Sequence, residues 1–128
     1  MENISVKKRL RNNIRVIVVD DDPDIVDITT ESLEQADIKV VGTGFDGKDA
    51  VTLYRKLHPD LLILDMKMPN YDGRYAIKNI ISDYPQAKIL VLTGHADDYN
   101  FKDSGITSIL RKPFNISKLV EAIDSAME

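Results

Sequence analysis

The sequence predicts an α/β fold in which five strands alternate with five helices and form one parallel sheet. Three runs of four apolar residues are too short for helices and lack the polar alternation of half-exposed strands; they are Val16–Val19, Leu61–Leu64 and Ile89–Leu92. The segments between strands show helical spacing with start or stop signals. Such alternation requires right-handed crossovers and places helices on both faces of the sheet.

The length and composition are those of one folded domain. With 128 residues, 43% of them apolar and 30% charged, the chain is long enough for a core and too apolar to be disordered. The net charge of −4 argues against a nucleic-acid-binding surface, and the absence of cysteine excludes disulfides, thiolate catalysis and zinc–cysteine sites. The two histidines, His58 and His95, are not spaced as a metal-binding pair.

The beginning of the chain differs from the rest. Residues 1–13, which include the basic stretch VKKRLRNN, are expected to form a solvated tail, and residues 14–128 the folded domain. Because no apolar run exceeds four residues, we expect a cytoplasmic protein without a signal peptide or a membrane span.

The first two helices have clear boundaries. The first begins after Asp22-Pro23, because aspartate is a favoured cap and proline fits the first helical position. Its expected buried stripe consists of Ile25, Thr29, Leu33 and Ala36. A weaker apolar run, Lys39–Val41, predicts the second strand. A helix from Gly47 to Leu57 follows, and Pro59 stops it.

The second half continues the alternation. The third helix begins at Asp72 as cap and ends before Pro85, with an inward face formed by Ile77, Ile80 and Ile81. A short polar helix over ADDYNFKDSG ends at Gly105 and leads into the fifth strand, Ser108–Leu110. The last helix has Asn115 as cap and buries Leu119, Val120 and Ile123.

Polar residues follow four of the predicted strands. In parallel sheets ligands bind outside the carboxyl ends of the strands, so these residues are candidates for a site. Asp20 and Asp21 follow the first strand, and they precede the cap residue, so capping does not explain them. The third, fourth and fifth strands lead to Asp65, Thr93 and Lys112, each of which has an ordinary structural explanation when taken alone.

Taken together, these residues predict a site for a metal ion and a phosphoryl group. Carboxylates that converge at one edge raise each other's pKa, and a divalent cation relieves the repulsion. Ligands that are all oxygen suit Mg²⁺. The hydroxyl of Thr93 and the ammonium of Lys112 add donors for phosphoryl oxygens. A carboxylate at such a site can attack phosphorus and form an acyl phosphate.

The chain resembles the receiver domain of two-component response regulators over residues 14–127. The motifs that carry the resemblance are VVDDD, LDMKMPNYDG, VLTG and LRKPF, in this order on five strand–helix units. The resemblance implies a flavodoxin-like three-layer sandwich, with the strands of its sheet in the order 2-1-3-4-5. It also implies a cis peptide bond between Lys112 and Pro113.

The same resemblance implies roles for the strand-end residues. Asp65 would accept a phosphoryl group from a histidine kinase or a histidine phosphotransfer protein. Asp21 would bind Mg²⁺ directly and Asp20 mainly through water, and the backbone carbonyl of Lys67 would be a further ligand. Thr93 would donate a hydrogen bond to the phosphoryl group and Lys112 would pair with it. The domain would be a signalling switch that promotes only its own phosphorylation and dephosphorylation, and not a turnover enzyme.

Some positions depart from the family or tune the site. Ile109 stands where the family has an aromatic switch residue; isoleucine lacks a phenol and has a stiff χ1, so we expect backbone shifts to carry the signal. Lys67 and His95 are expected to flank the mouth of the pocket and to modulate the approach of water or of a phosphatase. Gly94 is expected to leave the site open to small phosphodonors.

Two alternatives remain open at this stage. VVDDD also fits the nucleophile motif of haloacid-dehalogenase-like phosphatases, with Asp20 as nucleophile and Asp22 as acid and base, but that leaves Asp65 without a role. A pseudo-receiver scaffold would keep the fold and lack phosphoryl chemistry.

The expected partners follow from the resemblance. They are the phosphodonor and either a separate protein target or a covalently linked output domain, with no direct binding of nucleic acid or membrane. The docking surface would be helix four, strand five and helix five, with Tyr99, Phe101 and Ser108. The domain would be a monomer or a weak phosphorylation-dependent dimer. Whether it stands alone or belongs to a longer protein stays open.

Overall fold

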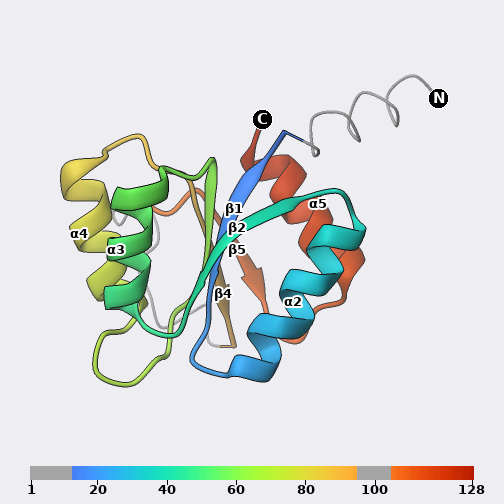
Figure 1. Cartoon of the computed structure of the whole chain (residues 1–128), viewed down its shortest axis with the longest axis horizontal. Helices are drawn as coiled ribbons and strands as arrows, with labels where there is room; N and C mark the ends of the chain where they lie inside the picture. The colour runs from blue at the N-terminus through green and yellow to red at the C-terminus, as the bar shows by residue number, and fades with distance from the viewer. Residues whose placement is uncertain (1–12, 95–104) are drawn as a thin grey trace.

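A central parallel sheet with helices on both faces makes up the protein (Figure 1). The computed structural model describes residues 13–94 and 105–128. Its five strands lie in the order β2-β1-β3-β4-β5, which confirms the order implied by the resemblance. The strands are β1 Arg15–Val19, β2 Lys39–Gly44, β3 Leu61–Asp65, β4 Ile89–Thr93 and β5 Ser108–Arg111.

In the described residues, two pairs of helices cover the sheet. Helices α3 and α4 cover one face of the sheet and α2 and α5 the other (Figure 1). Their bounds are α2 Pro23–Gln35, α3 Gly47–Leu57, α4 Gly73–Asp83 and α5 Ile116–Ala126. The predicted basic tail and the predicted short helix over ADDYNFKDSG fall almost entirely outside the described residues. Within the described ranges, no helix combines the length and the apolar character that crossing a membrane would require.

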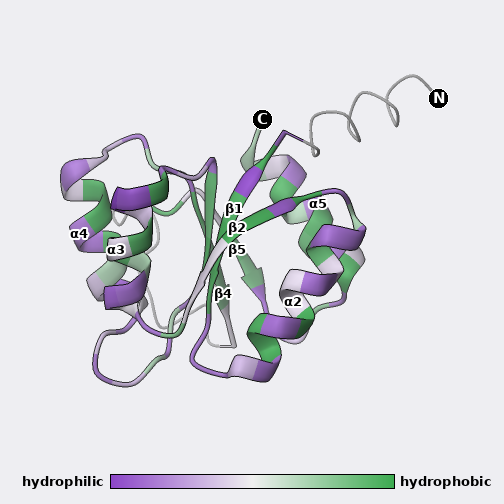
Figure 2. Ribbon diagram, viewed as in Figure 1, coloured by the Kyte–Doolittle hydropathy of each residue, from purple (hydrophilic) through white to green (hydrophobic). Residues whose placement is uncertain are grey.

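The core consists of two apolar layers separated by the sheet. Alternate residues of the central strands face opposite sides: Ile17 and Leu62 pack toward α3 and α4, whereas Val18 and Ile63 pack toward α2 and α5. Strands β3 and β4 are buried along their whole length, and Figure 2 shows the apolar strands between helices with polar outer faces. Each fully buried large apolar side chain contributes about 1.5–3 kcal/mol, so the centre of the sheet is a stable platform.

Each described helix begins with a side chain that caps its first turn. Asp22, Asp72 and Asn115 accept backbone N–H hydrogen bonds in the first turns of α2, α4 and α5, as predicted. Asp46 caps α3 in the same way, a cap that was not predicted from the sequence. Because each of these helices follows a strand, all four described helices start at the carboxyl edge of the sheet.

The predicted inward face of α2 was wrong at Ile25. Val26, Thr29 and Leu33 are the buried residues, and Ile25 is 40% exposed. At about 100° per residue, Val26 lies about 20° from Leu33 around the helix axis, whereas Ile25 lies about 80° away. The other inward faces hold: Ile77, Ile80, Leu119 and Ile123 are buried, and Ile81 and Val120 are half-buried and pack against the core.

Candidate functional site

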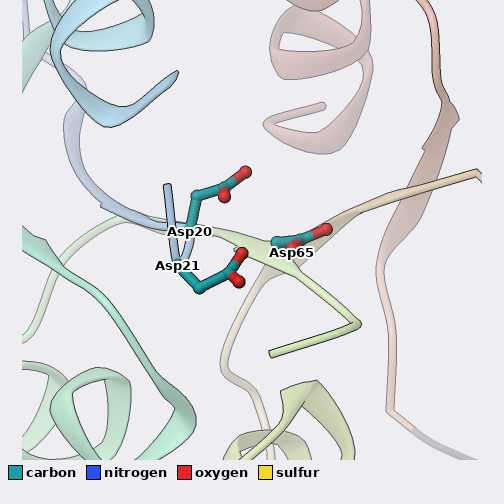
Figure 3. A group of neighbouring side chains, drawn as sticks. All are labelled: Asp20, Asp21 and Asp65. Carbon is teal, nitrogen blue, oxygen red and sulfur yellow. The ribbon is translucent and has the colours of Figure 1, made fainter. Parts of the chain in front are cut away.

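Three carboxylates meet at the carboxyl edge of the sheet, as Figure 3 shows. We call Asp20, Asp21 and Asp65 the acidic cluster; each offers one oxygen, and these oxygens all lie within 4.8 Å of one another. The strand register explains the encounter, because Val19 pairs with Leu64 and the next residue on each strand is an aspartate. Asp20 and Asp65 are buried, with 3% and 6% of their surface exposed, whereas Asp21 is exposed.

A lysine that directly follows the edge strand β5 reaches the acidic cluster. The Nζ of Lys112 lies 3.0 Å from Oδ1 of Asp65 and 3.5 Å from Oδ2 of Asp20. Its backbone N–H donates to the carbonyl of Thr93 at 2.8 Å, which fixes the chain where β5 ends. The peptide bond between Lys112 and Pro113 is cis, as the resemblance implied.

The hydroxyl-bearing residue of β4 is also at this edge. Thr93 is the last residue of β4 and is buried. Asp65 pairs with Leu92, so Thr93 lies one position beyond Asp65 along the neighbouring strand. The sheet therefore brings the ends of β1, β3, β4 and β5 together, as the sequence predicted.

Burial and mutual repulsion disfavour the charged forms of the carboxylates in the acidic cluster. Burial raises the pKa of Asp65, and the charges of Asp20 and Asp21 add to the rise, although the hydrogen bond and charge of Lys112 oppose it. Burial also raises the pKa of Asp20, against the lowering effects of the Asp22 backbone N–H and of Lys112.

Lys112 stays a cation in this setting. Burial alone lowers the pKa of Lys112, but its hydrogen bond to Asp65 and the charges of Asp65 and Asp20 outweigh burial, so the pKa is raised. Three carboxylates against this ammonium leave an excess of negative charge, which a cation would neutralise. The donor set is all oxygen, so its chemistry fits a hard ion such as Mg²⁺.

The remaining predicted residues include some that the structure describes and some that lie outside the described residues. Lys67 is exposed on the loop after β3, and Gly94 is exposed, with nothing within 4 Å of a Cβ added there. Ile109 is half-buried in β5 and pairs with Val91, and Ser108 begins that strand. His95, Tyr99 and Phe101 lie outside the described residues. Asp22 is the cap of α2.

Sequence reasoning missed the contacts of the turn between β2 and α3. The N–H of Asp20 donates to the carbonyl of Gly44 at 3.2 Å, so this turn touches the acidic cluster's own backbone. The glycine-rich stretch GTGFDG was the available signal, because glycines often mark places where two backbones approach closely.

Comparison with known proteins gives the family. The sequence model described as the response regulator receiver domain matches residues 16–124. The chain belongs to this family. As a receiver domain it is part of two-component signal transduction, and the haloacid-dehalogenase interpretation of VVDDD loses its support.

Relatives and solved structures agree with the assignment. The receiver domain is 37% identical over 119 residues to the response regulator protein VraR of Staphylococcus epidermidis; the match covers 90% of this chain and 57% of that protein. The chemotaxis response regulator CheY4 of Vibrio cholerae is 30% identical, with a TM-score of 0.80 and coverage of 88% of this chain and 98% of CheY4. A chain of the CheX–CheY–BeF3–Mg²⁺ complex of Borrelia burgdorferi shares the fold, with a TM-score of 0.84, 24% identity and 90% coverage of both chains.

Proposed function

We propose that this receiver domain is a phosphorylation-controlled switch in which Asp65 accepts a phosphoryl group from a phosphohistidine of a sensor kinase or a phosphotransfer protein. The observation that carries the proposal is the contact of Asp65 with Lys112 at 3.0 Å inside the acidic cluster. This arrangement combines a nucleophilic carboxylate, a fixed cation and an all-oxygen site for a metal.

The proposed reaction uses these groups as follows. A carboxylate oxygen of Asp65 attacks phosphorus, the P–N bond of the phosphohistidine breaks, and its electron pair returns to the imidazole. Mg²⁺ bound by Asp20, Asp21, Asp65 and the backbone carbonyl of Lys67 would supply positive charge for the phosphoryl oxygens. Lys112, already beside Asp65, would pair with one of those oxygens.

The other strand-end groups complete the proposed switch. The Thr93 hydroxyl would donate a hydrogen bond to the phosphoryl group. The acyl phosphate carries about −1.5 to −2 of charge in place of the single negative charge of the Asp65 carboxylate, so the site gains at most about one negative charge, which would bias the segment from Thr93 to β5 and α5. With Ile109 half-buried in β5, we expect the bias to act through backbone shifts of that strand. In this scheme the domain is no turnover enzyme, and its output goes to a protein target or a linked domain.

Titration with beryllofluoride and Mg²⁺, followed by NMR, tests this function. A working acceptor shows saturable shifts that require both ions, at Asp65 and around Ile109. A chain that shows no such shifts is a pseudo-receiver scaffold, and the proposal fails.

We propose that exposed isoleucines of α2 and α5 belong to the surface that binds the phosphodonor protein. Ile25 and Ile28 on α2 are 40% and 62% exposed, and Ile116 at the start of α5 is 40% exposed. Helices α2 and α5 contact each other, and both begin just after residues of the site. A donor that brings phosphohistidine to Asp65 must cover this edge, and exposed large apolar side chains are suited to such an interface.

Ile28→Ser is expected to lower the rate of transfer from a phosphoprotein by about tenfold, since one interface hot spot contributes more than about 1 kcal/mol. The probe is a phosphorylated histidine phosphotransfer protein shown to phosphorylate the wild-type chain. Phosphorylation by acetyl phosphate should not change, and Glu34→Ser, at the exposed far end of α2, is the control. An equal loss with both donors would place the defect in the acceptor chemistry and not in docking.

Lys67 and His95 are expected to set the lifetime of the acyl phosphate. Lys67 is exposed next to the acceptor strand, so Lys67→Ala should open the mouth to water and shorten the half-life by about threefold, a barrier change well under 1.4 kcal/mol. His95→Ala is predicted to act in the same direction. Decay of the label after removal of the donor measures both variants, and an unchanged half-life in both contradicts this role.

A further inference from the structure

The turn that leads from the last residue of β2 to the first residue of α3, residues 44–47, contacts both segments that carry the acidic cluster. On one side, the carbonyl of Gly44 accepts the N–H of Asp20 at 3.2 Å. On the other side, the N–H of Gly47 donates to the carbonyl of Tyr71 at 2.6 Å. Tyr71 belongs to the loop between β3 and α4, residues 66–72, which starts directly after Asp65. The turn thus bridges the two segments through backbone hydrogen bonds.

Only glycine fits at the contact between the turn and the loop. A Cβ at Gly47 would lie 2.3 Å from the carbonyl oxygen of Asp72 and 2.9 Å from that of Tyr71. Both obstacles are backbone atoms, so no side-chain rotation can relieve the clash. A side chain at Gly47 would therefore displace the loop or the turn.

The turn and the loop each have local hydrogen bonds of their own. In the turn, Asp46 accepts from the N–H of Asp49 at 2.8 Å, and the carboxylate of Asp49 accepts from the N–H of Phe45 at 2.9 Å. The loop is closed by the N–H of Gly73, which donates to the carbonyl of Met66 at 3.0 Å.

Side chains of α3 and α4 contact Tyr71 of the loop. The Nζ of Lys48, which directly follows the turn, lies 5.6 Å from the centre of the Tyr71 ring, and the rings of Tyr71 and Tyr75 are 4.8 Å apart. Contacts of these kinds contribute about 0.5–1.5 kcal/mol each, so the contact of Lys48 with Tyr71 adds to the backbone hydrogen bond of Gly47.

We propose that this turn is a positioning element that sets the separation between Asp20 and Asp21 on one side and the loop that carries Lys67 on the other, and so sets the affinity for Mg²⁺. The inference rests on the proposed function, in which both segments supply ligands. Mg²⁺ requires near-ideal octahedral geometry with ligands at about 2.0–2.1 Å, so displacement by a few tenths of an ångström is costly. Gly47 is the residue through which the turn acts on the loop.

The test compares two glycine-to-alanine variants on the same side of the sheet. Gly47→Ala forces the loop away, whereas the close neighbours of a Cβ at Gly42 are ends of flexible side chains, Leu57 Cδ1 at 3.0 Å and Leu53 Cδ2 at 3.4 Å, with Ile17 Cγ1 at an ordinary contact distance of 3.7 Å. The melting temperature in EDTA and the Mg²⁺ dissociation constant from NMR titration are measured for both. We expect Gly47→Ala to weaken Mg²⁺ binding by about tenfold or more and Gly42→Ala by less than about twofold. Excess Mg²⁺ should restore beryllofluoride binding to Gly47→Ala.

The outcomes separate this inference from the function on which it rests. Wild-type protein that binds no Mg²⁺ overturns both proposals. Wild-type binding with equal Mg²⁺ affinity in Gly47→Ala, or equal weakening in Gly42→Ala, overturns only the role of the turn. If Gly47→Ala does not fold, Tyr71→Ala removes the ring contacts and should weaken Mg²⁺ binding by about threefold; unchanged affinity in that variant also overturns it.

Discussion

Asp65→Asn is expected to incorporate no phosphoryl group from acetyl phosphate and Mg²⁺, whereas the wild-type chain gains one. The amide keeps the shape of the buried side chain at the end of β3 but is not a nucleophile toward phosphorus. Intact mass spectrometry at neutral pH measures the gain, and circular dichroism verifies that the variant is folded.

Asp22→Asn is the matched control for Asp65→Asn. Asparagine caps a helix as well as aspartate does, so α2 should keep its first turn. The control removes one negative charge next to the acidic cluster and should still be phosphorylated. Peptide mapping of the wild-type product should place the label on Asp65; label on Asp20, together with an inactive Asp22→Asn variant, would instead favour a phosphatase-type nucleophile.

Asp20→Asn is expected to change stability in opposite directions with and without Mg²⁺. Without the ion, the free energy of unfolding should rise by about 1–2 kcal/mol, because a buried carboxylate next to two others is replaced by a neutral group. With Mg²⁺ at 100 times its dissociation constant, the wild-type chain should gain about 2.7 kcal/mol, most of which the variant should lose. Urea denaturation in EDTA and in Mg²⁺ measures both effects.

The pH dependence of that result has a definite sign. The pKa values of Asp20 and Asp65 are raised by burial above the ordinary value of 3.8, so the folded chain holds protons that the unfolded chain has lost. Without Mg²⁺, these two groups therefore make the free energy of unfolding fall as pH rises from about 3.8 through their raised pKa values. Asp20→Asn should show a shallower fall than Asp22→Asn, and an equal fall would contradict the assigned cost of the cluster.

The sequence predicted the fold well where burial is complete. Continuous apolar runs identified β3 and β4 because both faces of those strands are covered by helices. The strand order came from the resemblance, since alternation of strands and helices permits several orders. Ile25 was misplaced because steps of four drift around a helix that has 3.6 residues per turn.

The sequence predicted those site residues that directly follow a strand. Asp20, Asp65 and Lys112 converge because parallel strands in register deliver their next residues to the same edge. Asp20 is buried and Asp21 is exposed because successive side chains of an extended backbone point in opposite directions. This difference was not predicted. The contact of Gly47 with Tyr71 joins segments far apart in sequence, and no local pattern reports such a contact.

The complete burial of β3 and β4 has a consequence for how such a domain can diversify. The backbone amides of β3 and β4 should exchange hydrogen most slowly, because they are exposed only when the whole domain unfolds. Asp65, the proposed acceptor, is the last residue of β3. The isoleucines of α2 lie on an outer surface whose substitution leaves that interior intact. Duplicated genes can therefore acquire different signalling partners through a few substitutions on α2, while the acceptor site stays the same. Such substitutions separate one signalling pathway from another with little loss of folding stability.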